Sequence, residues 1–378
     1  MLPVANLTLM KKTWIVPLTL ALTVSLSLAG CGVRIDDGSG DGVRADQTQI
    51  ARYRASACQE AISDGIKQVF AGSPNLLAYK DGFEARSKVL GPRWPRPQVK
   101  IAGKEKPETL PEPQPYRIPG NGEALMQKLV DCQVDALNDG LTLAALAREN
   151  QESSQGNKDA VAQLKQTTAL AKVLVATGVA MERENKQLAQ AASVTLPPAN
   201  PSKLSPWRYQ DGRWHRDKTV VNAKDKEEKT PLSDQQKSEL SKGIKQLDSL
   251  RYNIEKNAAQ GRDNQLKQLV SEEITPLLRR QLQELVTQLG TDPREAVYQP
   301  FENLSGSDKQ AAAAGLKIAS EVQMNLLTVT PDAKAALIAQ TLSSLVDLQE
   351  RLGQDMGSLP GLNAKDAQVK TAKVGVKP

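Results

Sequence analysis

Apolar residues recur every three or four positions over most of the chain, which is the period of an amphipathic helix. Two long stretches carry this pattern, residues 49–193 and residues 233–360. In the first stretch, residues 49–71 predict one helix. Residues 121–193 predict two more, separated by a turn near 153–156. The pattern favours an all-α fold of one or more antiparallel multi-helix bundles, because repeated breaks argue against one long coiled coil.

Helix-start signals divide the C-terminal stretch into shorter helices. Ser233-x-x-Gln236 matches a capping box, in which a hydroxyl and an amide cap each other's backbone N–H groups. Further starts are predicted where a capping residue or a proline precedes an apolar stripe: Thr275-Pro276, Asp292-Pro293-Arg294-Glu295, Ser307-x-x-Gln310 and Thr330-Pro331-Asp332.

Residues 92–119 interrupt the helical pattern with eight prolines. Proline fixes φ and lacks an N–H group, so neither a helix nor a central strand fits this segment. We expect an extended, polyproline-like crossing. Its first half is basic and contains Trp94, so a partner protein could recognise this segment. The favoured interpretation is a semi-rigid connector on the surface.

Residues 206–216 carry a β-hairpin pattern, since Asp211-Gly212 suits a two-residue type I′ turn. The turn predicts three opposite pairs: Gln210 with Arg213, Tyr209 with Trp214, and Arg208 with His215. A candidate contact patch for an anionic polymer, a headgroup or a partner comprises the aromatic and basic residues of the hairpin: Trp207, Tyr209, Arg213, Trp214 and His215. The favoured alternative is an aromatic face that packs on the helices.

Cys58 and Cys132 each lie on the apolar stripe of a predicted helix, at spacings of three and four from apolar neighbours. The third cysteine, Cys31, belongs to the export signal described next, and two further cysteines in an exported chain favour a disulfide, with two inert buried thiols as the alternative. We therefore predict a Cys58–Cys132 bond.

The start of the chain carries an export signal: a basic pair, an apolar run and small residues before a cysteine. Leu28-Ala29-Gly30-Cys31 closes this run and resembles a bacterial lipobox. The resemblance implies cleavage before Cys31 and a lipid, such as palmitate, on Cys31. Met10 is the better start, because Lys11 and Lys12 then follow the initiator directly. The apolar run is too short for a spanning helix.

These patterns define the expected organisation of the chain. The predicted parts are a signal peptide (1–30), a flexible tether (31–48), an N-terminal helical region (49–193) containing the Pro-rich segment (92–119), a hairpin and charged linker (194–232), a C-terminal helical bundle (233–360) and a disordered basic tail (361–378). The sequence leaves open whether the two helical regions form one domain or two.

The composition excludes some classes of function. The net charge is +6, and loss of the signal leaves +4, which is mild for a nucleic-acid binder. Aromatic residues make up 3%, which is low for a sugar-binding cleft. His215 is the one histidine, and it lies in the predicted hairpin, so we expect no metal and no cofactor. We find no serine-hydrolase motif and no phosphate-binding loop, so we expect no enzyme.

Three functions remain. The first is a non-catalytic helical scaffold or adaptor for another envelope component, held in the membrane through lipidated Cys31. The second is a bundle that binds a lipid or another small apolar ligand. The third is a cell-wall-active enzyme that uses carboxylates, because any two of the 43 acidic residues can meet in space.

The lipobox also implies a location. Gly32 follows the cysteine where an Asp favours inner-membrane retention, which implies the outer membrane in a Gram-negative cell and the outer face of the plasma membrane in a Gram-positive one. The opening Cys31-Gly32-Val33-Arg34-Ile35, followed by a helical body, is similar to uncharacterised actinobacterial lipoproteins with ferritin-like bundles. With so few histidines, such a bundle would hold no metal.

Overall fold

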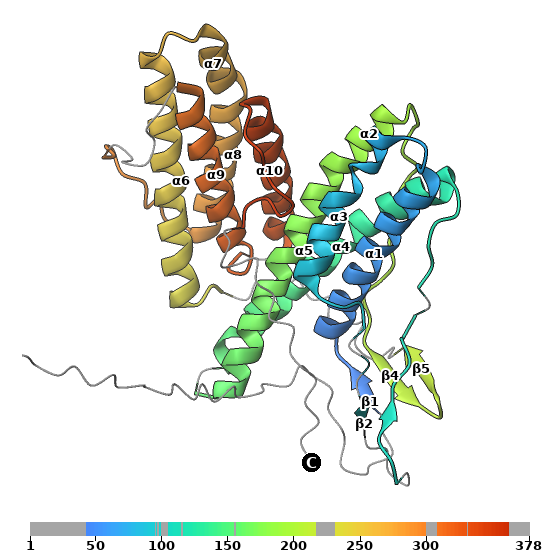
Figure 1. The fold of residues 1–378 in the computed structure, drawn as a ribbon. Helices are drawn as coiled ribbons and strands as arrows, with labels where there is room; N and C mark the ends of the chain where they lie inside the picture. Colours follow the sequence, from blue (N-terminus) through green and yellow to red (C-terminus); the bar gives the residue numbers. More distant parts are fainter. Residues whose placement is uncertain are drawn as a thin grey trace, which may run out of the picture.

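The computed structural model describes residues 43–94, 96, 98–99, 105–114, 116–154, 156–216, 231–299, 308–330 and 332–362. Within these residues the predicted all-α fold is confirmed, because helices form most of the structure and strands form two small sheets (Figure 1). Cys31, the signal and the tail from 363 onward lie outside the described residues.

The first half of the chain forms a helical bundle with two small sheets at one end (Figure 1). Its helices are α1 (Gln47–Val69), α2 (Pro74–Leu77), α3 (Lys80–Leu90), α4 (Gly122–Ser153) and α5 (Lys158–Ala191). Its strands are β1 (Val43–Ala45), β2 (Gln98–Val99), β3 (Glu108–Thr109), β4 (Trp207–Gln210) and β5 (Arg213–Arg216). We call these helices the N-terminal bundle. The predicted turn between the two long helices is confirmed.

The second half forms another bundle, which we call the C-terminal bundle. Its helices are α6 (Asp234–Gln260), α7 (Asn264–Leu269), the π-helical turn η2 (Val270–Ile274), α8 (Thr275–Leu289), α9 (Asp308–Leu326) and α10 (Asp332–Arg351). The capping box at the start of α6 is confirmed, with the Ser233 hydroxyl and the Gln236 side chain each bonded to the other's backbone N–H.

Two glycines bring α4 and α5 close together along their length. A Cβ at Gly140 would lie 2.9 Å from the Val175 backbone nitrogen, and one at Gly178 would overlap the Leu137 side chain. Because a larger residue at either position would require a shift, the two glycines allow these long antiparallel helices to pack closely. They span about 50 Å and form the frame on which α1 and α3 pack.

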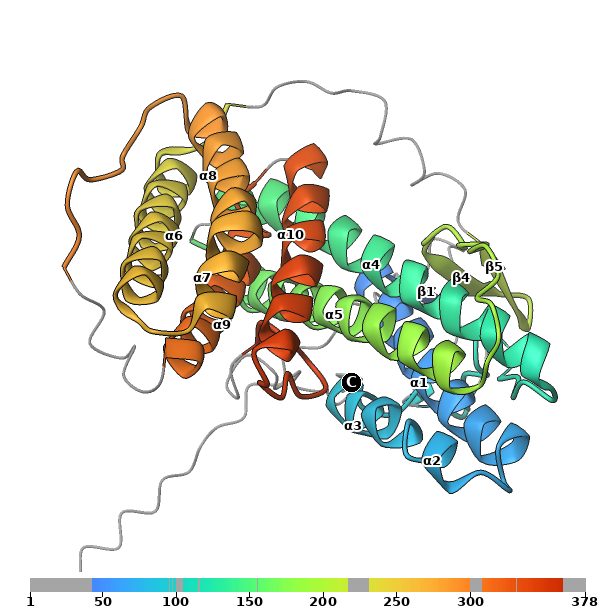
Figure 2. The same cartoon turned by 90° about the horizontal axis from the view of Figure 1, so that it is seen from above.

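The two bundles share one hydrophobic core. Leu174 on α5, Leu247 on α6 and Leu342 on α10 are all buried in the same hydrophobic cluster. Figure 2 shows α10 between the rest of the C-terminal bundle and the pair α4 and α5. Polar contacts add to this interface, since Arg148 Nη1 donates to the Thr330 carbonyl at 2.7 Å. The two regions therefore form one packed body.

The structure corrects the predicted tether, which covered residues 31–48. Val43–Ala45 forms β1, antiparallel to β4, and α1 begins at Gln47. Asp46 caps α1, because its carboxylate accepts the Gln49 backbone N–H at 2.8 Å. A strand of three residues is too short to leave a periodic signal, and its stability comes from tertiary contacts such as the full burial of Ala45.

One predicted helix start is wrong, and another is right only in its position. α8 begins at Thr275, as the Thr275-Pro276 pattern predicts, but Thr275 does not cap it, because the helical backbone runs on from α7 through η2 into α8. The π-helical turn lies just before Pro276, which lacks a donor, and a buried stripe continues across it through Ile274 and Leu278. The segment Asp292-Pro293-Arg294-Glu295 is not helical. Asp292 bonds Arg294 locally instead, and nearby Val297 is 72% exposed, so no apolar face supports a helix there.

The other two predicted starts agree with α9 and α10, although Ser307 and Pro331 themselves lie outside the described residues. The Pro-rich segment contains no helix among its described residues. It does contain a short antiparallel ladder that the sequence did not predict, with Gln98 opposite Thr109 and Val99 opposite Glu108.

Candidate functional site

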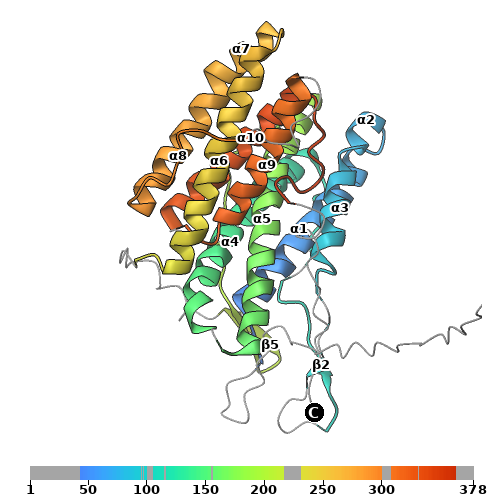
Figure 3. The same ribbon diagram turned by 90° about the vertical axis from the view of Figure 1, so that its left-hand side faces the viewer.

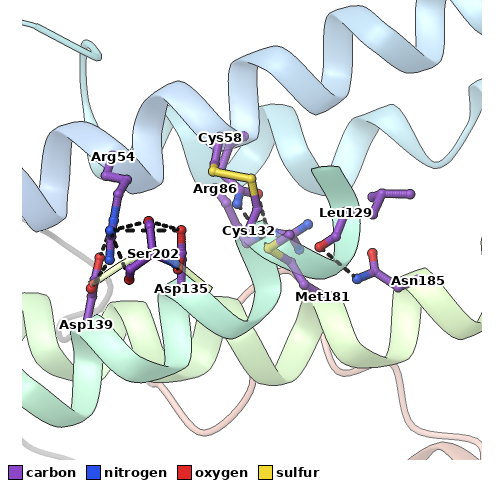
Figure 4. The surroundings of a disulfide bond; sticks show 11 residues. Arg54, Cys58, Arg86, Leu129, Cys132, Asp135, Asp139, Met181, Asn185 and Ser202 are labelled. Atoms are coloured by element: carbon purple, nitrogen blue, oxygen red, sulfur yellow. Dashed lines mark hydrogen bonds and ion pairs between the residues drawn. A yellow bond between two sulfur atoms is a disulfide. The ribbon is translucent and has the colours of Figure 1, made fainter. Parts of the chain in front are cut away.

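The predicted disulfide joins α1 to α4 (Figure 4). The Cα atoms of Cys58 and Cys132 are 5.9 Å apart, and both residues are buried. The bond closes a segment that contains α2, α3 and the Pro-rich region. Both sulfurs are bonded, so neither cysteine is a free nucleophile.

A polar stripe runs along α4 with a spacing of four residues: Gln127, Asp131, Asp135 and Asp139. The stripe binds the extended segment 194–206, which leads from α5 back to β4 and which we call the strap. Asp131 accepts the Asn200 backbone N–H at 2.7 Å, and Asp135 accepts that of Ser202 at 2.8 Å. The Gln127 amide donates to the Pro198 carbonyl. The stripe therefore satisfies backbone groups of a segment that has no ladder of its own.

Arg54 on α1 completes this network (Figure 4). Its guanidinium forms a bidentate pair with both carboxylate oxygens of Asp139 and donates to the Ser202 hydroxyl at 2.6 Å. Burial raises the pKa of Asp139 to about 7, and the charge of Arg54 opposes that rise. Burial also lowers the pKa of Lys128 on the same helix.

A second buried ion pair joins α3 to α5. Arg86 on α3 is fully buried, and its guanidinium donates to both oxygens of Glu184 on α5. Arg86 Nε also donates to Gln59 Oε1 at 2.8 Å. A Cβ at Gly82 would lie 2.6 Å from Glu184 Oε1, so the glycine makes room for this pair.

Neighbouring groups occupy both oxygens of Asp135 and of Asp139. Asp135 accepts the Ser202 N–H on one oxygen and the Ser202 hydroxyl on the other, while both oxygens of Asp139 accept from Arg54. These hydrogen bonds join α1, α4 and the strap.

The hairpin has the predicted register, with Gln210 opposite Arg213, Tyr209 opposite Trp214 and Arg208 opposite His215. Positive φ angles at Asp211 (52°) and Gly212 (75°) fit the predicted type I′ turn. β1 adds a third strand beside β4, which the sequence did not indicate.

The aromatic half of the candidate contact patch faces inward. Trp214 packs edge-to-face on Tyr209 and on Trp94, whose ring also packs on Tyr53 of α1, with ring centroids 5.3–5.7 Å apart. The Trp214 indole N–H donates to the Pro111 carbonyl at 2.8 Å. The aromatic cluster therefore ties the hairpin and the Pro-rich segment to α1, which is a structural role.

The basic half of the patch faces outward. Arg213 and His215 are exposed, and so is Arg216, whose guanidinium carbon lies 5.4 Å from the centroid of the Trp207 ring. The five predicted patch residues therefore separate into an inner aromatic group and an outer basic group.

Two shallow grooves lie beside the end of the α4–α5 pair nearer to the sheet. The larger has a volume of about 420 Å³ and includes Thr48, Asn150 and Thr167. The smaller, of about 290 Å³, includes Lys165, Lys172 and Glu239. Both are open to solvent and are lined by polar and apolar residues, whereas sites for small molecules usually enclose most of their ligand.

Sequence reasoning missed the stripe on α4 and both buried ion pairs. A signal for the stripe was present, because polar residues at a strict spacing of four lie on one helix face. No local signal existed for Arg86 and Glu184, which are 98 positions apart.

Within the described residues, no group of three or more His, Cys, Asp and Glu side chains is arranged to hold a metal ion. No described helix is long and apolar enough to cross a membrane. Comparison with known protein families, curated proteins and solved structures finds no match for this chain.

Proposed function

We propose that this protein is a membrane-anchored lipoprotein of the bacterial cell envelope and acts as a non-catalytic scaffold or adaptor. Its anchor is the lipid on Cys31, as implied by Leu28-Ala29-Gly30-Cys31. A single lipid anchor attaches a folded body to the membrane without a spanning segment.

One observation carries the proposal. The chain enters the N-terminal bundle at one end, and exposed apolar side chains lie at the opposite end. The chain enters the described body at Val43, beside the start of α1. Ile118 and Val194, which are 44% and 45% exposed, lie where α4 begins and α5 ends. Because α1 is antiparallel to α4, these two residues lie near the far end of α1, about 35 Å from β1.

Half-buried apolar residues surround this distal end: Val69, Phe70, Leu76, Leu77, Tyr79 and Leu196. Exposed large apolar side chains grouped at one end are typical of protein contact surfaces. The rigid frame of α4 and α5 holds this surface away from the point of attachment. A scaffold needs this geometry, in which one end is anchored and the other meets a partner.

The anchor is tested with Cys31→Ala. We expect the variant to leave the membrane fraction or to keep its signal uncleaved. Normal membrane attachment of Cys31→Ala would refute the anchor.

The adaptor role is tested by photo-crosslinking in cells from positions 118 and 194. We expect one dominant envelope protein or cell-wall component to be captured from both positions. Position 283 on α8, which is exposed on the C-terminal bundle, is the matched control and should not capture it. Equal capture from all three positions would refute the distal surface as the contact.

The larger groove favours a second function, the binding of a lipid or other small apolar ligand. Its volume of about 420 Å³ lies within the range of small-molecule sites. Extraction of purified protein with organic solvent, followed by mass spectrometry, tests this alternative. A stoichiometric lipid that Leu164→Gln at the groove abolishes would favour it over the scaffold.

A further inference from the structure

The three-stranded sheet presents one face to the core and the other to solvent. Tyr209 and Trp214 face the aromatic cluster, so the alternation of side chains turns Arg208, Arg213 and His215 to the opposite face. Arg213 and His215 are exposed, and Arg208 is partly exposed. Arg208 and Arg213 carry positive charge on this face, and Asp211, in the turn, is the one acidic residue of the hairpin. The outer face is therefore basic.

This basic face lies at the end of the molecule where the chain from the anchor arrives. Figures 1 and 3 show the sheets at one end, away from α2 and α7. Eleven residues separate Cys31 from Val43 in β1, and a chain of that length reaches about 40 Å at most. Of the whole body, the sheet is thus the part that the chain brings closest to the lipid.

The residues that connect Cys31 to the sheet carry a net negative charge. Residues 32–42 contain Asp36, Asp37 and Asp41 against one base, Arg34. An anionic bilayer repels that segment, so any electrostatic attraction must come from the folded body. Basic side chains near an anionic bilayer contribute favourably to binding.

We propose that the outer face of the sheet, formed by Arg208, Arg213 and His215, rests on anionic lipid headgroups and orients the tethered body, and that Arg216, exposed at the end of β5 beside the Trp207 ring, adds to this contact from the edge. The inference rests on the proposed lipid anchor. With this end on the membrane, the distal apolar end points away from the bilayer and toward a partner.

The protein carries its own probe for this contact. Trp94, Trp207 and Trp214 belong to the aromatic cluster behind the sheet, and the fourth tryptophan, Trp14, lies in the signal. Chain 31–378 carrying Cys31→Ala is mixed with vesicles containing dansyl-labelled phosphatidylethanolamine. We expect energy transfer from tryptophan to dansyl with vesicles of phosphatidylglycerol and phosphatidylcholine. Pure phosphatidylcholine vesicles should give none, and salt should weaken the signal.

Charge removal tests which face binds. The triple variant Arg208→Gln, Arg213→Gln and Arg216→Gln should weaken vesicle binding about fivefold for each arginine removed. The matched control removes three exposed basic residues from the C-terminal bundle, Lys242→Gln, Arg279→Gln and Arg280→Gln, and should bind as the parent does. Arg213→Glu alone, beside the hairpin turn, should weaken binding further than Arg213→Gln, and circular dichroism checks that each variant is folded.

Equal loss of binding in the sheet and control variants, or no preference for anionic vesicles, would overturn the proposal. Because this assay uses protein without a lipid, its failure leaves the anchor untouched. Conversely, Cys31→Ala that stays on the membrane in cells but is released when the triple variant is added would show that the headgroup contact acts without the lipid, whereas Cys31→Ala that stays on the membrane even with the triple variant would refute the anchor.

Discussion

The two bundles share one hydrophobic core but differ in the polar groups buried inside them. The N-terminal bundle contains a disulfide and two buried ion pairs, Arg54–Asp139 and Arg86–Glu184. The centre of the C-terminal bundle contains neutral groups instead. Gln281 donates to Gln323 at 3.2 Å and accepts from Thr341 at 2.9 Å.

This difference determines which conditions act on each bundle. Redox state and pH change the groups inside the N-terminal bundle, whereas amides and hydroxyls titrate at neither acidic nor neutral pH. In the C-terminal bundle the buried carboxylate of Asp248 forms an ion pair with Arg251, whose side chain is partly exposed. The N-terminal bundle is thus expected to be the part whose stability responds to its surroundings.

Removal of the disulfide should have the largest effect. Cys58→Ser with Cys132→Ser is expected to lower the free energy of unfolding by about 4–5 kcal/mol, because the bond closes a loop of 74 positions. Hydrogen exchange followed by mass spectrometry should show the loss of protection first in α1 and α3. Equal loss in α6 and α9 would show that the shared core makes both bundles unfold as one unit.

Loss of Arg86 should be next in size. Arg86→Met is expected to cost about 3–5 kcal/mol, because it leaves the Glu184 carboxylate buried without its partner. The double variant Arg86→Met with Glu184→Leu should recover much of that loss, since no buried charge remains. Urea denaturation measures both, and a double variant no more stable than the single one would contradict this account.

The sequence supplied most of the helical layout but little of this difference between the bundles. Asp211-Gly212 fixed the hairpin register, and the apolar stripes around Cys58 and Cys132 indicated the disulfide, since both signals are local. The sequence did not predict β1, because three residues carry no period. Thr275-Pro276 marked the start of α8 but not a cap, because the helical backbone continues from η2 across the proline. Arg86 and Glu184 meet only after folding, so neither contains local evidence of the other.

The pH response of Asp139 is the third test. Burial raises its pKa from 3.8 to about 7, so the folded state holds this proton more tightly than the unfolded chain does. The unfolding free energy should therefore fall as the pH rises from about 4 to 7, by at most about 4 kcal/mol. The Asp139→Asn variant has no carboxyl group to titrate at this position. The difference in unfolding free energy, variant minus parent, should therefore rise as the pH rises from about 4 to 7.

Thermal melts at a series of pH values measure this difference. Gln283→Ala, at an exposed position on α8, changes no titrating group, so this control should follow the parent at each pH. If the parent instead gains stability over Asp139→Asn as the pH rises, the pairing with Arg54 outweighs burial, and the pKa of Asp139 is lowered.

The smallest expected effect lies in the C-terminal bundle. Thr341→Val removes the hydroxyl that donates to Gln281 and leaves a buried amide oxygen without that donor, which should cost about 1–2 kcal/mol. Combined with Gln281→Met and Gln323→Met, the same change should cost much less, because the whole polar group is then replaced by apolar side chains. Urea denaturation at two pH values measures both variants, and the cost should be the same at each, since no titrating group is involved. A pH-dependent cost would mean that the polar groups of the two bundles are coupled through their common core.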